Sequence, residues 1–150
     1  MKRILVALLV SSASANISQV TDLYTKQDIS ALQQQLAAKK TAFAGKDLER
    51  YGNHYTMLAY RNATGSSEIH EHEADVFVIE EGDATIILGG KMIGGHTEKP
   101  GELRGKSIEG GEKRPLKTGD IIHIPAGVPH QILVSPGKPI TYFVVKVSGQ

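Results

Sequence analysis

Three side chains of types that commonly bind metals alternate along one short segment of the sequence. Glu68, His70 and His72 are separated by single residues, and Asp75 follows three positions later. Successive side chains of a β-strand point to opposite faces, so a strand here would place the first three on one face, with Asp75 after a bend. The chain has no cysteine. Any metal ion must therefore rest on nitrogen and oxygen donors.

A second cluster reads GDIIHIPAGVPH and runs from Gly119 to His130. We expect a strand that stops at Pro125, because proline has no N–H for the ladder of a central strand. The turn through Gly127 then presents His130 at the start of the next strand. His123 lies in the first of these strands, and alternation leaves it equally compatible with a pocket and with the outer face.

The elements that position these residues are short strands separated by turn residues. Seven segments with strand-like, alternating patterns are expected at 55–61, 68–72, 76–80, 84–88, 121–124, 131–134 and 141–147. Such regularly spaced short strands indicate an all-β sandwich or closed barrel. The segment 89–117 is rich in glycine and is expected to be a long functional loop or insertion without core strands.

One helix precedes the strands. Thr25 and Asp28 have the spacing of a helix cap, and Ile29, Leu32 and Leu36 then fall on one face, which predicts a helix over 26–38 lying against the outside of the domain. We therefore divide the chain into a leader over 1–15, an N-terminal extension with the helix over 16–54, and a barrel over 55–150.

The second cluster resembles the cupin signature G(x)5PxG(x)2H, which Gly119, Pro125, Gly127 and His130 match in type and spacing. The first cluster is similar to the other cupin motif, in which HxH precedes a glutamate and then a glycine. The resemblance covers 68–134, and Val134 stands where that second motif usually has asparagine. It implies a double-stranded β-helix, the jelly-roll barrel of cupins, and a homodimer formed by strand exchange.

The first motif can be aligned in two registers. Counting back from Gly82 with the motif's own spacing puts Asp75 at the glutamate position. His70 then takes the second histidine position and Glu68 the first. The other register uses His70 and His72 as the HxH pair and shortens the gap to Asp75 by one residue. We prefer the first, because spacing within a barrel fixes which side chain reaches the centre.

The resemblance implies that His70 and His130 bind a divalent metal ion, which is manganese, iron or zinc. Glu68 and Asp75 supply the remaining ligands in the first register, and His72 is a ligand in the second. Two histidines and one carboxylate suit non-heme iron. A site with both carboxylates would favour a harder ion such as manganese, or no metal. The reach of Asp75 is open, because aspartate is one carbon shorter than glutamate.

Charge and the N-terminus bear on location and partners. The formal net charge is +1. This balance provides no basic surface for nucleic acid. The N-terminus has the pattern of a signal peptide: the basic residues Lys2 and Arg3, an apolar run over 4–10 and an AxA pattern ending at Ala15. The apolar run is also compatible with a buried first strand. We expect cleavage after Ala15 and a periplasmic or secreted protein. The run is too short to span a bilayer.

Three functions fit these observations. The first is a metal-dependent enzyme of oxygenase or isomerase type that acts on a small polar molecule. The others are a non-catalytic module that binds a sugar-like molecule and a metal-free structural cupin. No catalytic residue is predicted. The pairs Tyr60 with Arg61 and Glu102 with Arg104 are more typical of surface pairs than of substrate contacts.

Overall fold

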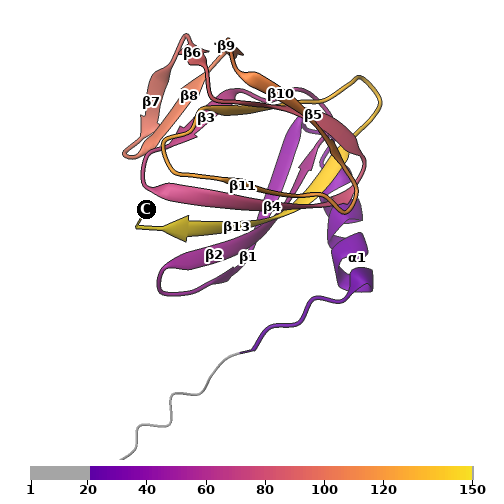
Figure 1. Cartoon of the computed structure of the whole chain (residues 1–150). Coiled ribbons are helices and arrows are strands. Elements are labelled where there is room, and N and C mark those ends of the chain that lie inside the picture. The colour runs from indigo at the N-terminus through magenta and orange to yellow at the C-terminus, as the bar shows by residue number, and fades with distance from the viewer. Residues whose placement is uncertain (1–20, 150) are drawn as a thin grey trace, which may run out of the picture.

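The computed structural model describes residues 21–149, which form one helix and facing antiparallel sheets (Figure 1). The leader predicted over 1–15, with its cleavage site after Ala15, lies outside the described residues. The helix is α1 (Lys26–Ala37). The strands are β1 (Phe43–Arg50), β2 (His54–Arg61), β3 (Ser67–His70), β4 (Glu73–Glu81), β5 (Asp83–Leu88), β6 (Lys91–Ile93), β7 (His96–Lys99), β8 (Glu102–Gly105), β9 (Ser107–Glu109), β10 (Glu112–Lys117), β11 (Ile121–Ile124), β12 (His130–Leu133) and β13 (Ile140–Ser148).

Two large sheets enclose the core. One has five strands in the order β1-β2-β13-β4-β11, and the other has six in the order β10-β5-β12-β3-β8-β7. A small two-stranded sheet, β6-β9, lies at one end (Figure 1). The C-terminal strand β13 is hydrogen-bonded between β2 and β4, so segments distant in sequence are joined in one sheet. This double-stranded β-helix with a single helix in the described part of the chain confirms the predicted fold class.

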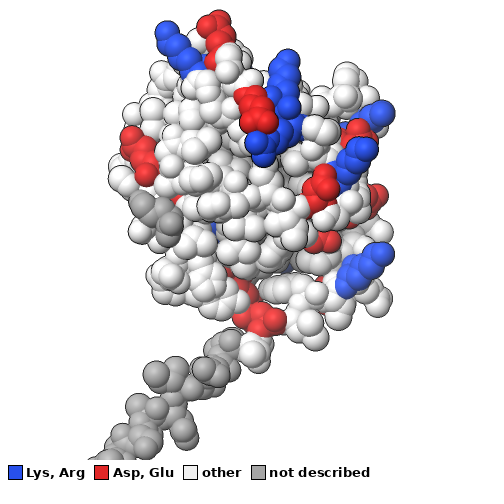
Figure 2. All heavy atoms as spheres, viewed as in Figure 1, with Lys and Arg blue, Asp and Glu red and all other residues white. Residues whose placement is uncertain are grey.

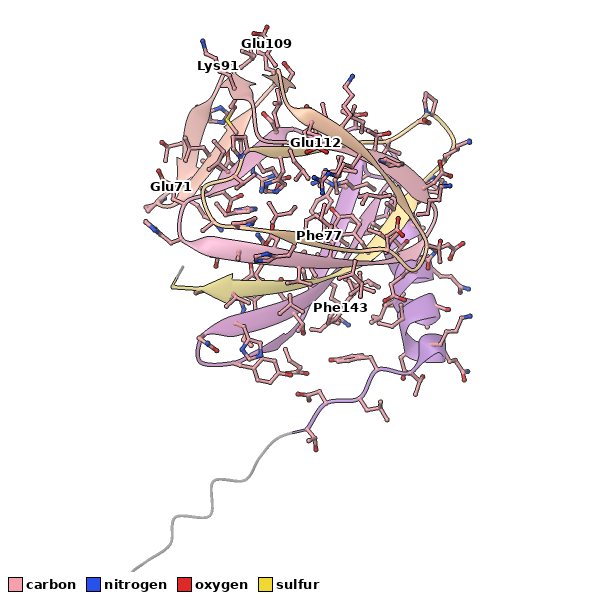
Figure 3. The ribbon with its side chains drawn as sticks, in the orientation of Figure 1. Glu71, Phe77, Lys91, Glu109, Glu112 and Phe143 are labelled. Carbon is pink, nitrogen blue, oxygen red and sulfur yellow. The ribbon has the colours of Figure 1, made fainter. Side chains whose placement is uncertain are left out.

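Alternation along the central strands decides which side chains enter the barrel. On β4, Phe77 and Ile79 point into the core cluster, and on β13 Tyr142 and Val144 do the same. Phe143, the residue between them, packs on the outer side of the same sheet. Figure 3 shows Phe77 and Phe143 on opposite sides of the five-stranded sheet. The strand period of two therefore produces one face toward the barrel interior and one toward the helix.

The helix covers the outer face of the five-stranded sheet, as predicted. Its capping box is formed: the Asp28 backbone N–H donates to Thr25 Oγ1 at 3.2 Å, and the Thr25 N–H donates to the Asp28 carboxylate at 2.9 Å. Leu36 is buried against Ala44 and Leu58. Within the described residues, no helix has the length and apolar character needed to cross a membrane.

The glycine-rich segment 89–117 does not lack core strands, so that prediction was wrong. It contains β6 to β10; β8 pairs with β3 and β10 pairs with β5 in the six-stranded sheet. Ile108 and Leu116 are buried. Several glycines lie between strands rather than within them, and Gly90, for example, has a φ of 76° in the connection from β5 to β6. The glycines here serve tight connections between short strands. The sequence alone does not distinguish such a series of short strands from one long loop.

The glycine of the first motif also has a structural reason. Gly82 joins β4 to β5 with a φ of 93°, and a Cβ at this position would lie 2.2 Å from the carbonyl oxygen of Pro139. Neither that conformation nor that contact suits another residue. The sharp turn fixes where β4 ends, and counting back from it in steps of two gives the residues of β4 that share one face.

Candidate metal centre

Four of the predicted metal ligands meet inside the barrel. Glu68 and His70 alternate on β3, and His130 at the start of β12 pairs with Glu68 across the antiparallel ladder. Asp75 comes from β4 in the opposite sheet, after a bend at 71–72. His70, His130 and Asp75 are 4%, 3% and 2% exposed. The cluster thus joins the two sheets at a point shielded from solvent.

The two imidazoles and the two carboxylates face one another. His70 Nε2 lies 3.5 Å from Glu68 Oε2 and 3.5 Å from Asp75 Oδ2. His130 Nε2 lies 4.0 Å from Glu68 Oε2 and 3.8 Å from Asp75 Oδ2. Donor atoms bound at about 2.1 Å to one tetrahedral ion are about 3.4 Å apart. Glu68, His70 and His130 also offer donor atoms that all lie within 4.8 Å of one another, whereas Asp75 is outside that group of three.

The histidine nitrogens are suited to an ion. Both ring nitrogens of His70 and Nε2 of His130 are buried without a hydrogen-bond partner in the described structure. Buried polar atoms are normally paired, so such atoms indicate a missing partner. His130 Nδ1 lies 3.1 Å from the carbonyl oxygen of Val128 and donates to it, which leaves the lone pair on Nε2 facing the cluster. Burial lowers the pKa of His130 and favours the neutral, metal-binding imidazole. The donor set therefore fits a divalent ion.

Asp75 points toward the two histidines, with its Oδ2 at 3.5 Å from His70 Nε2 and 3.8 Å from His130 Nε2. Its Oδ2 faces the histidines, while its Oδ1 accepts a hydrogen bond of 2.6 Å from Lys146 Nζ. The two residues are direct neighbours in the ladder between β13 and β4. One oxygen of Asp75 is thus committed to an ammonium group, and only the other is available to an ion.

The two carboxylate oxygens of Glu68 also have different partners. Its Oε1 accepts a hydrogen bond of 2.8 Å from Arg61 Nη2 and also pairs with Arg104, while Oε2 faces the histidines. Arg61 Nε donates to the Tyr142 hydroxyl at 2.9 Å, which orients the guanidinium. Burial raises the pKa of the Glu68 carboxyl, but the neighbouring His70 and the two guanidinium groups together hold that pKa well below its usual range.

The structure places the two remaining histidines of the clusters away from this centre. β3 ends at His70, so the alternation does not continue to His72, which is exposed beside Gly101. His123 is exposed on β11. The four residues that converge are those of the register counted back from Gly82, and the second register, which uses His72, does not correspond to this arrangement.

Several charged residues of the cluster were not expected there. Arg61, Glu102 and Arg104 were interpreted as members of surface pairs, but all three line the cavity beside Glu68. Lys146 was given no role. Alternation along β13 could have identified Lys146, because it shares the inward face with Tyr142 and Val144. The cross-strand partners that bring Arg61 and Arg104 to one carboxylate are not visible in a single sequence.

A cavity of about 930 Å³ opens beside the cluster. Glu68, His70 and Asp75 form part of its wall, and Met57, Phe77 and Val144 of the five-stranded sheet supply an apolar part. Phe77, labelled in Figure 3, also meets His130 edge-on, with ring centroids 6.4 Å apart. The cavity therefore gives a small molecule access to the side of the cluster that the barrel wall does not close.

Comparison of the structure with solved structures identifies the architecture. A Klebsiella pneumoniae protein with a double-stranded β-helix domain superposes with a TM-score of 0.60, at 14% identity over 87% of this chain and 93% of that one. The cupin domain of Schizosaccharomyces pombe Cnp3 gives 0.54, at 9% identity over 72% and 66%. The chain has the cupin fold.

A structure named for an enzymatic activity is also similar to this chain. A recombinant oxalate oxidase in complex with glycolate gives a TM-score of 0.52, at 14% identity over 71% of this chain and 51% of that one. No model of a known protein family matches the sequence, and no curated protein matches it either. At these identities the comparisons establish the cupin fold, and function must be argued from the site.

Proposed function

We propose that this cupin barrel binds a divalent metal ion through Glu68, His70 and His130, with Asp75 as a fourth ligand, and acts as a metal-dependent enzyme on a small molecule in the adjacent cavity. The observation that carries the proposal is the pair of buried Nε2 atoms of His70 and His130, which have no hydrogen-bond partner and face two carboxylate oxygens.

The residues around the site prepare it for such chemistry. When bound, a divalent ion would polarise a substrate oxygen or activate dioxygen, as in isomerases and oxygenases. Val128 fixes the tautomer of His130. Lys146 and Arg61 each hold one oxygen of a carboxylate, so that Asp75 and Glu68 present single oxygens to the centre. The cavity admits a molecule of limited size to this side.

Metal analysis of the purified protein tests the proposal. We expect about one equivalent of manganese, iron or zinc in protein prepared without chelator, and loss of that metal in His70→Ala and in His130→Ala. His123→Ala is the matched control, because His123 is an exposed histidine on β11. Parent protein that takes up no metal after supply of all three ions would refute the proposal.

A metal-free binding module is the second candidate, and one observation favours it: Glu68 and Asp75 are already paired with cationic side chains. Thermal unfolding with metals and with sugar-like small molecules separates the two. Stabilisation by a small molecule in the presence of chelator, with no metal uptake, would support the binding module.

We also propose that the protein is exported, on the basis of the signal-peptide pattern ending at Ala15. Sequencing the N-terminus of the protein isolated from its native host tests this. A mature chain that begins at Asn16 is the expected result. A chain that still carries residues 1–15 would contradict export by cleavage.

A further inference from the structure

The candidate metal centre is surrounded by charged side chains that balance each other before any ion is bound. Three acidic and three basic groups form this buried network: Glu68, Asp75, Glu102, Arg61, Arg104 and Lys146. Their side chains range from 2% to 30% exposed. By contrast, Figure 2 shows acidic and basic side chains interspersed at the surface, where water screens them.

Every member of the network has a partner of opposite charge. Arg61 pairs with Glu68, Arg104 pairs with both Glu68 and Glu102, and Lys146 pairs with Asp75. Among these six groups, three negative and three positive charges sum to zero. Lys99 also pairs with Glu102 at 3.0 Å, but its side chain is 66% exposed and is screened by water. The carboxylate-rich appearance of the sequence is therefore misleading, because cations from β2, β8 and β13 compensate the carboxylates.

This balance changes what a divalent ion would experience. Two carboxylates alone would neutralise an ion of charge +2, but here the flanking cations have already matched those carboxylates. The ion would leave an excess of two positive charges in a partly dehydrated space. Excess buried charge is costly unless a counter-charge accompanies it. The cavity beside the cluster is the open route by which such a counter-charge can arrive.

We propose that the metal ion and an organic anion bind to this site together, each strengthening the other, and that the substrate class is a small carboxylate or enolate with an apolar body. The inference rests on the proposed metal site. The apolar part follows from Met57, Phe77 and Val144, which line the cavity beside the charged residues of the same strands. An anionic oxygen completes the charge at the ion, while the rest of the molecule contacts the apolar wall.

Benzoate and benzamide provide a direct test, because they share shape and differ in charge. The affinity of the chelator-treated protein for Mn²⁺ is measured by calorimetry with no addition, with benzoate and with benzamide, after correction for binding of Mn²⁺ by benzoate itself. We expect benzoate to tighten Mn²⁺ binding about tenfold, within the usual range for coupled sites, and benzamide to have no effect. By reciprocity, Mn²⁺ must tighten benzoate binding by the same factor.

A charge variant sharpens the test. Arg104→Gln removes one cation from the network, so it should tighten Mn²⁺ binding in the absence of benzoate and reduce the benzoate effect. Arg114→Gln is the matched control, because Arg114 is an exposed residue paired with exposed Glu112 on β10. It should leave both quantities unchanged. If Arg104→Gln folds poorly, the Mn²⁺ affinity of the parent protein with benzoate and with benzamide still tests the coupling.

The outcomes separate this inference from the proposed function. Tight Mn²⁺ binding with equal affinity in benzoate, benzamide and buffer overturns the coupling and leaves the metal site standing. Mn²⁺ binding that releases about one proton per ion and does not respond to benzoate also overturns the coupling. In that case water loses a proton, and the resulting hydroxide supplies the counter-charge. No Mn²⁺ binding under any of these conditions overturns both proposals.

Discussion

One end of the barrel interior is apolar and closed, whereas the other is charged and opens into a cavity, although the same strands build both. On β4, Ile79 belongs to the apolar core and Asp75 to the charged cluster. On β13, Ile140 and Lys146 are divided in the same way. Distance along a strand, and not the choice of face, separates the part that stabilises the fold from the part that can do chemistry.

The two ends of the barrel interior are stabilised in different ways. The apolar end gains stability from removal of hydrocarbon from water, whereas each charge at the other end needs a partner to offset its lost hydration. We therefore expect the two ends to respond differently to substitution: loss of volume should matter at the apolar end, and loss of charge balance at the charged end.

The largest effect is expected from breaking the pair of Lys146 with Asp75. Lys146→Met leaves a carboxylate that is 2% exposed without its cation, and should lower the free energy of unfolding by about 4 kcal/mol. Urea unfolding measures this. The double variant Asp75→Leu with Lys146→Met is the control and should recover most of the loss, because two apolar side chains replace the whole pair. Equal losses in both variants would mean that packing, not charge, is the cause.

A slightly smaller effect is expected at the apolar end. Ile86 is fully buried in the core cluster, and Ile86→Ala should lower the free energy of unfolding by about 3 kcal/mol through loss of contacts and an unfilled cavity. The affinity for Mn²⁺ should stay within about twofold of the parent value, because Ile86 does not line the cavity beside the cluster. A large loss of Mn²⁺ affinity in a folded Ile86→Ala protein would show that the two ends are coupled.

Metal binding should stabilise the protein through the charged end alone. At a metal concentration one hundred times the dissociation constant, a site present only in the folded state adds about 2.7 kcal/mol. Thermal unfolding of the parent protein with Mn²⁺ and with chelator measures the difference. The stabilisation should persist in Ile86→Ala and vanish in His130→Ala. Stabilisation that survives in His130→Ala would place the ion elsewhere.

The fold was largely predictable because its signals are local. Alternating strands, the cap at Thr25 and the residues from Gly119 to His130 are short-range patterns, and the structure has the fold class they indicate. β1 and the strands within 89–117 were not predicted. The strands within 89–117 depend on partners more distant in sequence, such as β3 for β8, and on glycines that serve connections. β1 pairs with the neighbouring strand β2, so distance does not explain why it was missed.

The site was predictable to the extent that one strand or one turn determines it. The spacing of residues in the two motifs predicted four ligands that the structure brings together: Glu68, His70, Asp75 and His130. Spacing did not show that His72 falls beyond the end of β3. It also did not reveal the balancing cations, because each reaches the cluster from a different strand, and cross-strand neighbours are a property of the assembled sheets.

The smallest effect is expected from the helix, which lies outside the barrel and touches neither end of its interior. Thr25→Ala removes the side chain that accepts the Asp28 N–H, and should lower the free energy of unfolding by about 1 kcal/mol. Thr25→Ser keeps a hydroxyl at the cap and should restore most of that loss. Neither variant should change Mn²⁺ affinity or its response to benzoate, because α1 packs against the outer face of the five-stranded sheet. A change in Mn²⁺ affinity in Thr25→Ala would mean that the outer face influences the charged end through the sheet, and that position along the strands does not by itself separate stability from function.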